Sequence, residues 1–257
     1  MGTKAIDLNS DLGEGYGPFH VGTNVDDELF ALISSANVAC GFHGGDPLTI
    51  ERTVALAARH GVAVGAHPGF PDLVGFGRRV LAATPAEIEA DVLYQLGAVA
   101  GFCRAAGVPL HHVKAHGALY NLAVKERDVA DAIARATRRF DRDLAFVALP
   151  GSALEAAGEA AGLRVLREAF ADRAYNADGS LVARGVPGAV LTDPVAVAER
   201  MVTLVTTGTI ETIDGATLHL QADTICIHSD TPTAVPIARE LRARLEQAGI
   251  GIRAREA

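Results

Sequence analysis

The sequence has 257 residues, of which 49% are hydrophobic and 21% are charged, and its formal net charge is −8. A chain this apolar can bury a sizeable core, which excludes intrinsic disorder, and its acidic charge argues against binding to nucleic acid, because phosphate backbones would be repelled. The N-terminus has no signal peptide pattern, and no apolar run approaches the roughly 18 residues of a membrane span, so we expect a cytoplasmic protein with no membrane partner.

Seven short apolar runs alternate with helical patterns along the chain. Because these runs are mostly continuous rather than alternating, they predict parallel strands that are covered on both faces. The runs are residues 4–8, 37–41, 62–66, 111–115, 144–149, 164–170 and 224–228.

Helix start and stop signals lie between these runs. Residues 47–60 are predicted to form a helix that Asp46 caps and Gly61 ends, because glycine readily adopts the left-handed conformation of a helix C-terminus. Thr84 can cap a second helix, in which Glu87 completes a capping box. Two further helix starts of the same kind are Asp193-Pro194 and Thr231-Pro232.

Strands that alternate with helices predict a parallel α/β architecture, and both an open doubly wound sheet and a barrel fit this pattern. We favour a single-domain (β/α) barrel over residues 1–257, with about seven parallel strands, because polar residues follow nearly every strand. In a barrel the C-terminal strand ends meet at one place. Residues 171–192 show little helical periodicity and predict a long functional loop, of the kind that often serves as a lid.

The strand ends carry the candidate chemistry. Asp7, Asn9 and Asp11 share one face of the first strand, and Glu14 follows them. Lys114 follows the fourth strand, where a buried lysine needs a partner, and a carboxylate of the first strand is the obvious one. The other strand ends contribute His43, His67, Arg78, His112, His116, Glu168, Asp172, Arg173, Tyr175, His228 and Asp230.

This mixture of histidines, one lysine and carboxylates suits general acid–base chemistry on a polar substrate. A metal site is an alternative, since an aspartate with two histidines is a common ligand set. However, the sequence has no HxH or HExxH motif, and Lys114 would oppose a cation, so we predict no protein-bound metal. The sequence also lacks the GxxxxGK[ST] loop of many nucleotide sites.

Six segments carry a resemblance to a known family: IDLNSDLGEGYG, SANVACGFHGGDP, GAHPGFPDLVGFGRR, HVKAHGALYN, FADRAYNADGSL and ADTICIHSD. They resemble the LamB/YcsF family, which supplies the A component of bacterial 5-oxoprolinase, and the similarity extends over residues 4–252. It implies a seven-stranded barrel similar to those of polysaccharide deacetylases and some glycoside hydrolases.

The resemblance also implies an activity, namely ATP-dependent opening of 5-oxo-L-proline to L-glutamate, with formation of ADP and phosphate. It implies ATP as cofactor, as its magnesium complex, and two partner subunits, B and C. The alternatives are a metal-dependent hydrolase or deacetylase of an N-acyl or sugar substrate, and a non-catalytic component that binds 5-oxoproline.

Within that activity we predict two sets of site residues. Lys114 would stabilise charge on the carbonyl oxygen or phosphate, the histidines would transfer protons, and the arginines would bind carboxylate or phosphate. The predicted catalytic residues are His43, His67, Lys114, His116 and Asp11. The predicted substrate-binding residues are Asp7, Asn9, Arg78, Arg173, Tyr175, His228 and Asp230.

Overall fold

The computed structural model describes residues 4–19 and 26–255 of the chain. Within them, seven parallel strands form a closed barrel, because β9 pairs with both β6 and β1. In order around the barrel, the strands are β1 (Ala5–Leu12), β2 (Ser35–Ala39), β3 (Ala63–His67), β4 (Leu110–Val113), β5 (Ala145–Ala148), β6 (Arg164–Phe170) and β9 (Thr224–Ile227). Each predicted run overlaps one of these strands, so the predicted (β/α) barrel is confirmed.

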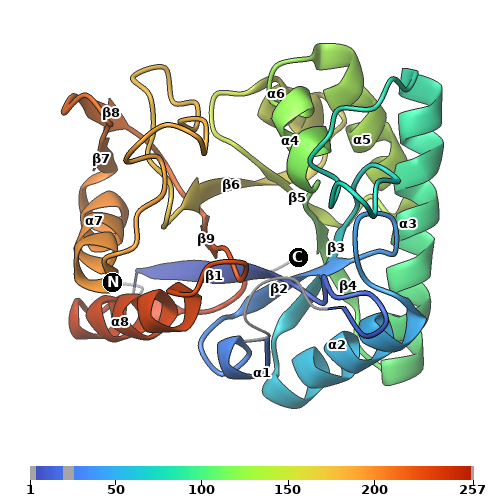
Figure 1. Ribbon diagram of the computed structural model, residues 1–257, viewed down its shortest axis with the longest axis horizontal. Coiled ribbons are helices and arrows are strands. Elements are labelled where there is room, and N and C mark those ends of the chain that lie inside the picture. Colours follow the sequence, from blue (N-terminus) through green and yellow to red (C-terminus); the bar gives the residue numbers. More distant parts are fainter. Residues whose placement is uncertain (1–3, 20–25, 256–257) are drawn as a thin grey trace.

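Helices cover the outside of the barrel (Figure 1). They are α1 (Asp26–Leu29), α2 (Pro47–His60), α3 (Pro85–Ala106), α4 (Gly117–Ala123), α5 (Arg127–Phe140), α6 (Ala153–Ala160), α7 (Pro194–Thr207) and α8 (Ala234–Gln247). An antiparallel hairpin of β7 (Thr209–Glu211) and β8 (Thr217–His219) follows α7, and β10 (Gly251–Ile252) pairs with the start of β1. In the two described ranges, none of the helices is long and apolar enough to cross a membrane.

Local signals position most helix ends as predicted. The side chain of Asp46 accepts hydrogen bonds from amides in the first turn of α2, and Gly61 ends that helix in the left-handed conformation. Thr84 and Glu87 form the capping box of α3, and Asp193 caps α7.

The start of α8 differs from the prediction. This helix begins at Ala234, after Thr233, and not at Thr231-Pro232. The amide of Ala234 donates to the carbonyl of Thr231, so the predicted start is a turn that precedes the helix.

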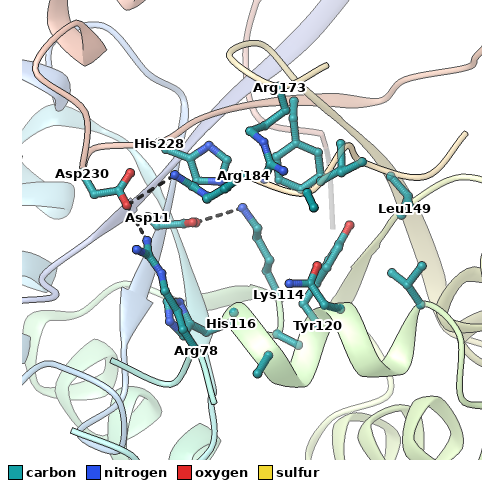
Figure 2. Close-up of a pocket in the computed structure, with 18 of the residues that line it drawn as sticks. Asp11, Arg78, Lys114, His116, Tyr120, Leu149, Arg173, Arg184, His228 and Asp230 are labelled. Atoms are coloured by element: carbon teal, nitrogen blue, oxygen red, sulfur yellow. Dashed lines mark hydrogen bonds and ion pairs between the residues drawn. The ribbon is translucent and has the colours of Figure 1, made fainter. Parts of the chain in front are cut away.

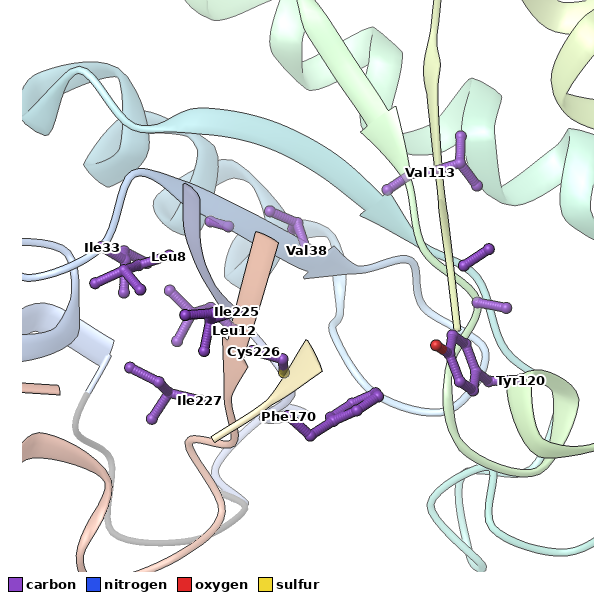
Figure 3. Close-up of a cluster of buried hydrophobic side chains, with 14 of the residues drawn as sticks. Leu8, Leu12, Ile33, Val38, Val113, Tyr120, Phe170, Ile225, Cys226 and Ile227 are labelled. Atoms are coloured by element: carbon purple, nitrogen blue, oxygen red, sulfur yellow. The ribbon is translucent and has the colours of Figure 1, made fainter. Parts of the chain in front are cut away.

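Side-chain alternation along the strands gives the barrel an apolar outer layer and a polar interior. Leu8 and Leu12 of β1 belong to the hydrophobic core between barrel and helices (Figure 3). Asp7, Asn9 and Asp11 alternate with them and point into the barrel, where they bond to side chains of other strands. The inward face of β1 therefore runs as a column of polar groups along the barrel axis.

Hydrogen bonds satisfy this polar interior. Asp7 accepts from the hydroxyls of Ser35 at 2.7 Å and Thr224 at 2.6 Å. Asn9 Nδ2 donates to Thr224 Oγ1 at 2.7 Å and Glu168 Oε1 at 3.2 Å. Parallel barrels are usually filled with branched aliphatic side chains. Here the interior is polar, so its stability depends on partners for each buried group.

His112 of β4 fills the interior at the level of Asn37 and Gly65, its neighbours across the sheet. His112 Nε2 donates to Asn37 Oδ1 at 2.7 Å. A Cβ atom on Gly65 would overlap the His112 ring, so glycine is required here to make room for the imidazole. His112 therefore has a structural position inside the barrel.

Residues 171–192, all of which the structure describes, form the predicted long loop and contain no helix. Two isolated bridges, Arg173 to Val190 and Tyr175 to Leu181, fold this loop back on itself. Its residues form one wall of the pocket at the C-terminal ends of the strands.

Candidate active site

A pocket of about 620 Å³ lies at the C-terminal ends of the barrel strands (Figure 2). This volume is in the usual range for small-molecule sites, and the C-terminal end is where barrels of this kind carry their active sites. Residues that follow β1, β3, β4, β6 and β9 line it together with the loop of residues 171–192. Barrel closure thus brings segments that are far apart in the sequence to one cavity.

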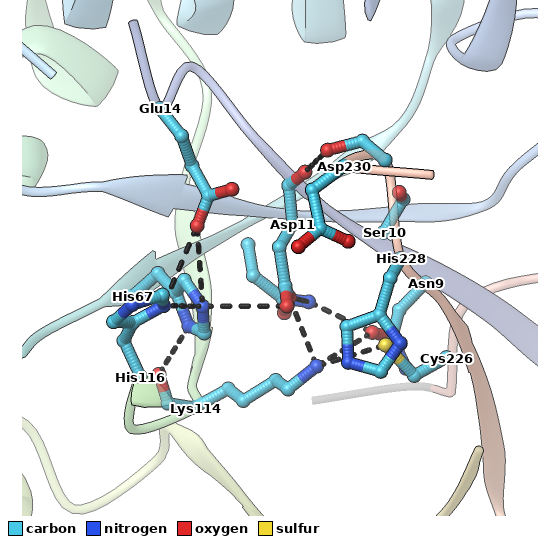
Figure 4. A network of polar contacts seen from close by, with 12 residues as sticks. Asn9, Ser10, Asp11, Glu14, His67, Lys114, His116, Cys226, His228 and Asp230 are labelled. Carbon is cyan, nitrogen blue, oxygen red and sulfur yellow. Dashed lines mark hydrogen bonds and ion pairs between the residues drawn. The ribbon is translucent and has the colours of Figure 1, made fainter. Parts of the chain in front are cut away.

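Lys114 lies at the floor of this pocket, and anionic and polar atoms enclose its ammonium group (Figure 4). Nζ forms ion pairs with Glu168 Oε1 at 2.8 Å and Asp11 Oδ1 at 2.9 Å, and donates to Cys226 Sγ at 3.1 Å. Burial alone would lower the pKa of Lys114, but the charges of Asp11 and Glu168 outweigh it and raise that pKa well above its usual value. These two carboxylates therefore favour the charged form of the side chain.

His67 lies next to Asp11, and its ring is nearly perpendicular to that of His116. His67 Nδ1 donates to the carbonyl of Lys114 at 2.7 Å, and His116 Nε2 donates to the carbonyl of Phe76 at 2.8 Å. The other two ring nitrogens, His67 Nε2 and His116 Nδ1, face each other at 3.1 Å. His67 Nε2 is also 3.5 Å from Asp11 Oδ2.

Glu14 and His43 complete this group of side chains. Glu14 Oε1 is 3.4 Å from His43 Nε2 and 3.4 Å from His116 Nδ1. The His43 ring stacks on His116, with centroids 3.6 Å apart and planes inclined by 2°. Burial raises the pKa of Glu14, and burial with the nearby charge of His67 holds the pKa of His43 well below its usual value.

A strained turn positions the two stacked rings. Phe76 has φ of 54° and Gly77 has φ of 61°, and the left-handed region is unusual for a residue such as phenylalanine. This conformation turns the Phe76 carbonyl toward His116. A Cβ on Gly77 would lie 2.7 Å from the Cβ of His43, so only glycine allows the turn to pack this closely. The turn therefore fixes the orientation of both imidazoles.

Ion pairs also line the pocket. Asp230 pairs with Arg78 and lies 3.8 Å from Arg184. His228 Nδ1 is 2.7 Å from Asp172 Oδ1. Burial alone would raise the pKa of Asp172, but the charge of His228 and its hydrogen bond lower that pKa below its usual value.

Known proteins resemble this chain over nearly its whole length. The profile of the LamB/YcsF family matches residues 6–257. The chain belongs to the LamB/YcsF family. Two relatives, from Symbiobacterium thermophilum and Thermus thermophilus, carry the name of the A component of 5-oxoprolinase and are each 54% identical over 249 residues. The matches cover 97% of this chain and, respectively, 95% and 99% of those proteins.

Solved structures agree with membership of the LamB/YcsF family. The lactam utilization protein from Thermus thermophilus is 53% identical, with a TM-score of 0.93 over 98% of this chain and 100% of that one. The catalytic domain of a peptidoglycan N-acetylglucosamine deacetylase from Eubacterium rectale is 13% identical, with a TM-score of 0.53 over 100% of this chain and 90% of that one. This second likeness shows a shared fold only.

The structure of this LamB/YcsF protein brings the five predicted catalytic residues together. Contacts below 4 Å connect them, directly or through Glu14, into one buried cluster. Four of the predicted substrate-binding residues line the pocket, namely Arg78, Arg173, His228 and Asp230.

Three predicted substrate-binding residues do not line the pocket. Asp7 and Asn9 are held by hydrogen bonds below Asp11, deeper in the barrel. Tyr175 is fully buried behind the pocket wall, where its hydroxyl accepts a hydrogen bond from the amide of Phe170 at 2.8 Å. Their positions give them a role in supporting the site, and correct the prediction that they contact substrate.

Sequence reasoning assigned no role to three residues that matter here: Glu14, Glu168 and Arg184. Glu14 and Glu168 were visible as acidic residues at strand ends, but their partners are 29 or more residues away in sequence, as in the pairing of Glu14 with His43. Arg184 lies in the loop of residues 171–192, where no periodic pattern predicts which way a side chain points. With Arg78 and Arg173 it gives the pocket three arginines, which suit a carboxylate or phosphate.

Two groups of described side chains lie close enough together to hold a metal ion. In each, the possible ligand atoms lie within 4.8 Å of one another. One group is Asp11, Cys226 and His228, but Lys114 Nζ already contacts the first two of these, so a cation occupies their centre. The other group is Glu14, His43, His67 and His116.

Proposed function

We propose that this protein is the A component of a 5-oxoprolinase, which opens 5-oxo-L-proline to L-glutamate while ATP is hydrolysed to ADP and phosphate. The proposal includes partner subunits B and C, the magnesium complex of ATP as cosubstrate, and a cytoplasmic location. Two relatives at 54% identity that carry the name of this 5-oxoprolinase component support it, as does the likeness to a lactam utilization protein.

The observation that carries the proposal is the buried ammonium group of Lys114 at the pocket floor, held between Asp11 and Glu168. A lactam is a stable amide, because its carbonyl carbon is weakly electrophilic and its nitrogen leaves poorly. A fixed cation in a site shielded from water stabilises charge that develops on the carbonyl oxygen or on a transferred phosphoryl group. The arginines at the rim suit the carboxylate of 5-oxoproline.

The reaction can be written so that each bond is accounted for. The lactam oxygen attacks the γ-phosphorus of ATP and ADP leaves, which gives an O-phosphorylated imidate. Water adds to the carbon, and the ring C–N bond breaks as the nitrogen takes a proton, which leaves an acyl phosphate. A second water releases phosphate and L-glutamate. Lys114 would stabilise the charge in these steps, and the adjacent histidine cluster would handle water and protons.

The test is glutamate formation from 5-oxo-L-proline and ATP by this chain with its partners B and C, each omitted in turn. We expect product only when all three are present. Lys114→Met should lower turnover about 100-fold or more, the scale of losing a key electrostatic group. Lys4→Met, an exposed position that contacts the Thr206 carbonyl, is the matched control. Turnover by B and C alone, or full activity of Lys114→Met, would refute the proposal.

A further inference from the structure

In the histidine cluster, two imidazole nitrogens and a buried carboxylate oxygen point toward one another. The geometry points to a binding site for a divalent transition-metal ion, with Glu14 Oε1, His67 Nε2 and His116 Nδ1 as its ligands. All three residues line the pocket, so the ion would be accessible to a substrate. This inference goes beyond the proposed function and does not depend on it.

The first argument is the direction of the ring protons. A neutral imidazole has one N–H and one lone pair. His67 uses its Nδ1–H for the carbonyl of Lys114, and His116 uses its Nε2–H for the carbonyl of Phe76. When both rings are neutral, the remaining nitrogens, 3.1 Å apart, both present lone pairs. Metal-binding histidines are oriented in this way, with the second nitrogen donating to a carbonyl or carboxylate. Burial alone would lower the pKa of His67, but Asp11, 3.5 Å from its Nε2, raises that pKa above its usual value, so a bound ion would displace the second proton of that ring.

The second argument is the third acceptor, Glu14 Oε1. It is 3.4 Å from His116 Nδ1 and 3.9 Å from His67 Nε2. The Glu14 side chain is only 7% exposed, and this oxygen has no hydrogen-bond partner among the described residues. A cation between the three atoms would compensate this buried carboxylate oxygen.

The third argument is the size of the gap. Metal–nitrogen and metal–oxygen bonds of about 2.1 Å place tetrahedral ligands about 3.4 Å from one another. The three separations here are 3.1, 3.4 and 3.9 Å, which bracket that value. Two nitrogens and one carboxylate suit Zn²⁺ and its first-row neighbours, whereas Mg²⁺ and Ca²⁺ prefer oxygen ligands.

Local charge also favours a cation, although Lys114 is near. Asp11, Glu14 and Glu168 supply three carboxylates, and two of them share the single charge of Lys114. A divalent ion would therefore balance the negative charge of the cluster and would not leave it with excess positive charge. The prediction that Lys114 opposes a metal paired the lysine with a first-strand carboxylate but did not include Glu168, its second partner.

His43 does not belong to the ligand set, although its Nε2 is 3.4 Å from Glu14 Oε1. Its ring is stacked parallel to that of His116 at 3.6 Å, so its nitrogens do not point at an ion held in the plane of the His116 ring. The fourth position is thus left for water or a substrate oxygen, as in catalytic zinc sites. An ion there would polarise a carbonyl or acidify its bound water.

The test measures metal and not turnover, so it stands apart from the test of 5-oxoprolinase activity. The full chain, purified without chelators and without a histidine tag, is analysed for metals by mass spectrometry. After stripping with EDTA it is titrated with Zn²⁺ by calorimetry, and with Co²⁺ by visible absorption. We expect about one ion per chain and the Co²⁺ spectrum of a low-coordinate nitrogen–oxygen site.

Glu14→Gln and His116→Gln should each weaken Zn²⁺ binding about 100-fold or more, because even changes to groups that only orient a ligand cost about 10- to 100-fold. His219→Gln, which removes an exposed histidine of β8, should bind like the wild type. Glu14→Gln is nearly isosteric and keeps the test valid if His116→Gln does not fold. Equal Zn²⁺ affinity in the wild type and Glu14→Gln would overturn the assignment, as would loss of binding in His228→Gln alone.

Discussion

Replacing Lys114 with methionine should lower the free energy of unfolding by about 3–5 kcal/mol, the loss typical of breaking a buried ion pair. Its Nζ lies 2.8 Å from Glu168 and 2.9 Å from Asp11. At an effective dielectric constant of about 20, each pair attracts by about 6 kcal/mol. The cost of burying three charges offsets most of this attraction. Methionine has a similar length, so the loss of packing is small.

Urea unfolding at neutral pH, followed by circular dichroism, measures this loss in Lys114→Met, Glu168→Gln and the double variant. The double variant should be more stable than Lys114→Met, because it removes one of the two uncompensated carboxylates, with a coupling energy of about 1–3 kcal/mol. Lys4→Met should change stability by less than about 0.5 kcal/mol, as exposed substitutions do.

The loss of unfolding free energy in Lys114→Met should also become smaller as the pH falls. Without the ammonium group, burial raises the pKa of the carboxyl groups it leaves behind. An acid whose pKa is raised by folding favours the folded state more as the pH falls from that pKa toward its unfolded value of about 4. A loss below about 1 kcal/mol, or no rescue by Glu168→Gln, would refute this account of the buried charges.

Two further predictions concern the barrel interior and the rim. Gly65→Ala should lower the free energy of unfolding by about 1–3 kcal/mol, because the added Cβ overlaps the His112 ring. Gly97→Ala is the control: its added Cβ meets nothing within 4 Å outside its own stretch of helix, so this variant should be neutral or stabilising. Equal melting temperatures of the two variants in thermal denaturation would contradict this. Folding lowers the pKa of Asp172. The carboxylate therefore stabilises the folded state at a pH above its unfolded pKa, and this stabilisation is lost as the pH falls through its folded pKa. Asp172→Asn should therefore be less stable than the wild type at neutral pH, and the difference in urea unfolding should shrink as the pH falls below about 4. A difference that stays constant with pH would exclude this ion pair as the cause.

The fold was predictable because its signals are local. Continuous apolar runs indicate strands buried on both faces, and Thr84 and Asp46 make their helix-capping hydrogen bonds within three residues of themselves. The start of α8 was missed for the same reason, since Thr231-Pro232 has the composition of a helix start but is used in a turn. Composition alone does not separate these two uses of a threonine–proline pair.

For the candidate site, only those features that follow from the barrel topology could be predicted from the sequence. Polar residues at strand ends must converge in a closed barrel, which is why Lys114 and Asp11 could be paired in advance. Depth along the barrel axis is set by strand register, and it separates Asp11 at the pocket from Asp7 inside the barrel. The ring-nitrogen contacts of His67 and His116 depend on backbone carbonyls, whose directions no residue pattern reveals.

The closure of the barrel by β9 has a consequence for how this protein is made. Thr224 and Cys226 come from the last barrel strand, yet they supply the contacts to Asp7 and Lys114 in the interior. During synthesis, each of these buried charges therefore lacks one of its contacts until nearly all of the chain has left the ribosome. Until then β1 and β6 are open sheet edges, able to pair with other chains. The nascent chain is thus most exposed to aggregation just before its site becomes complete.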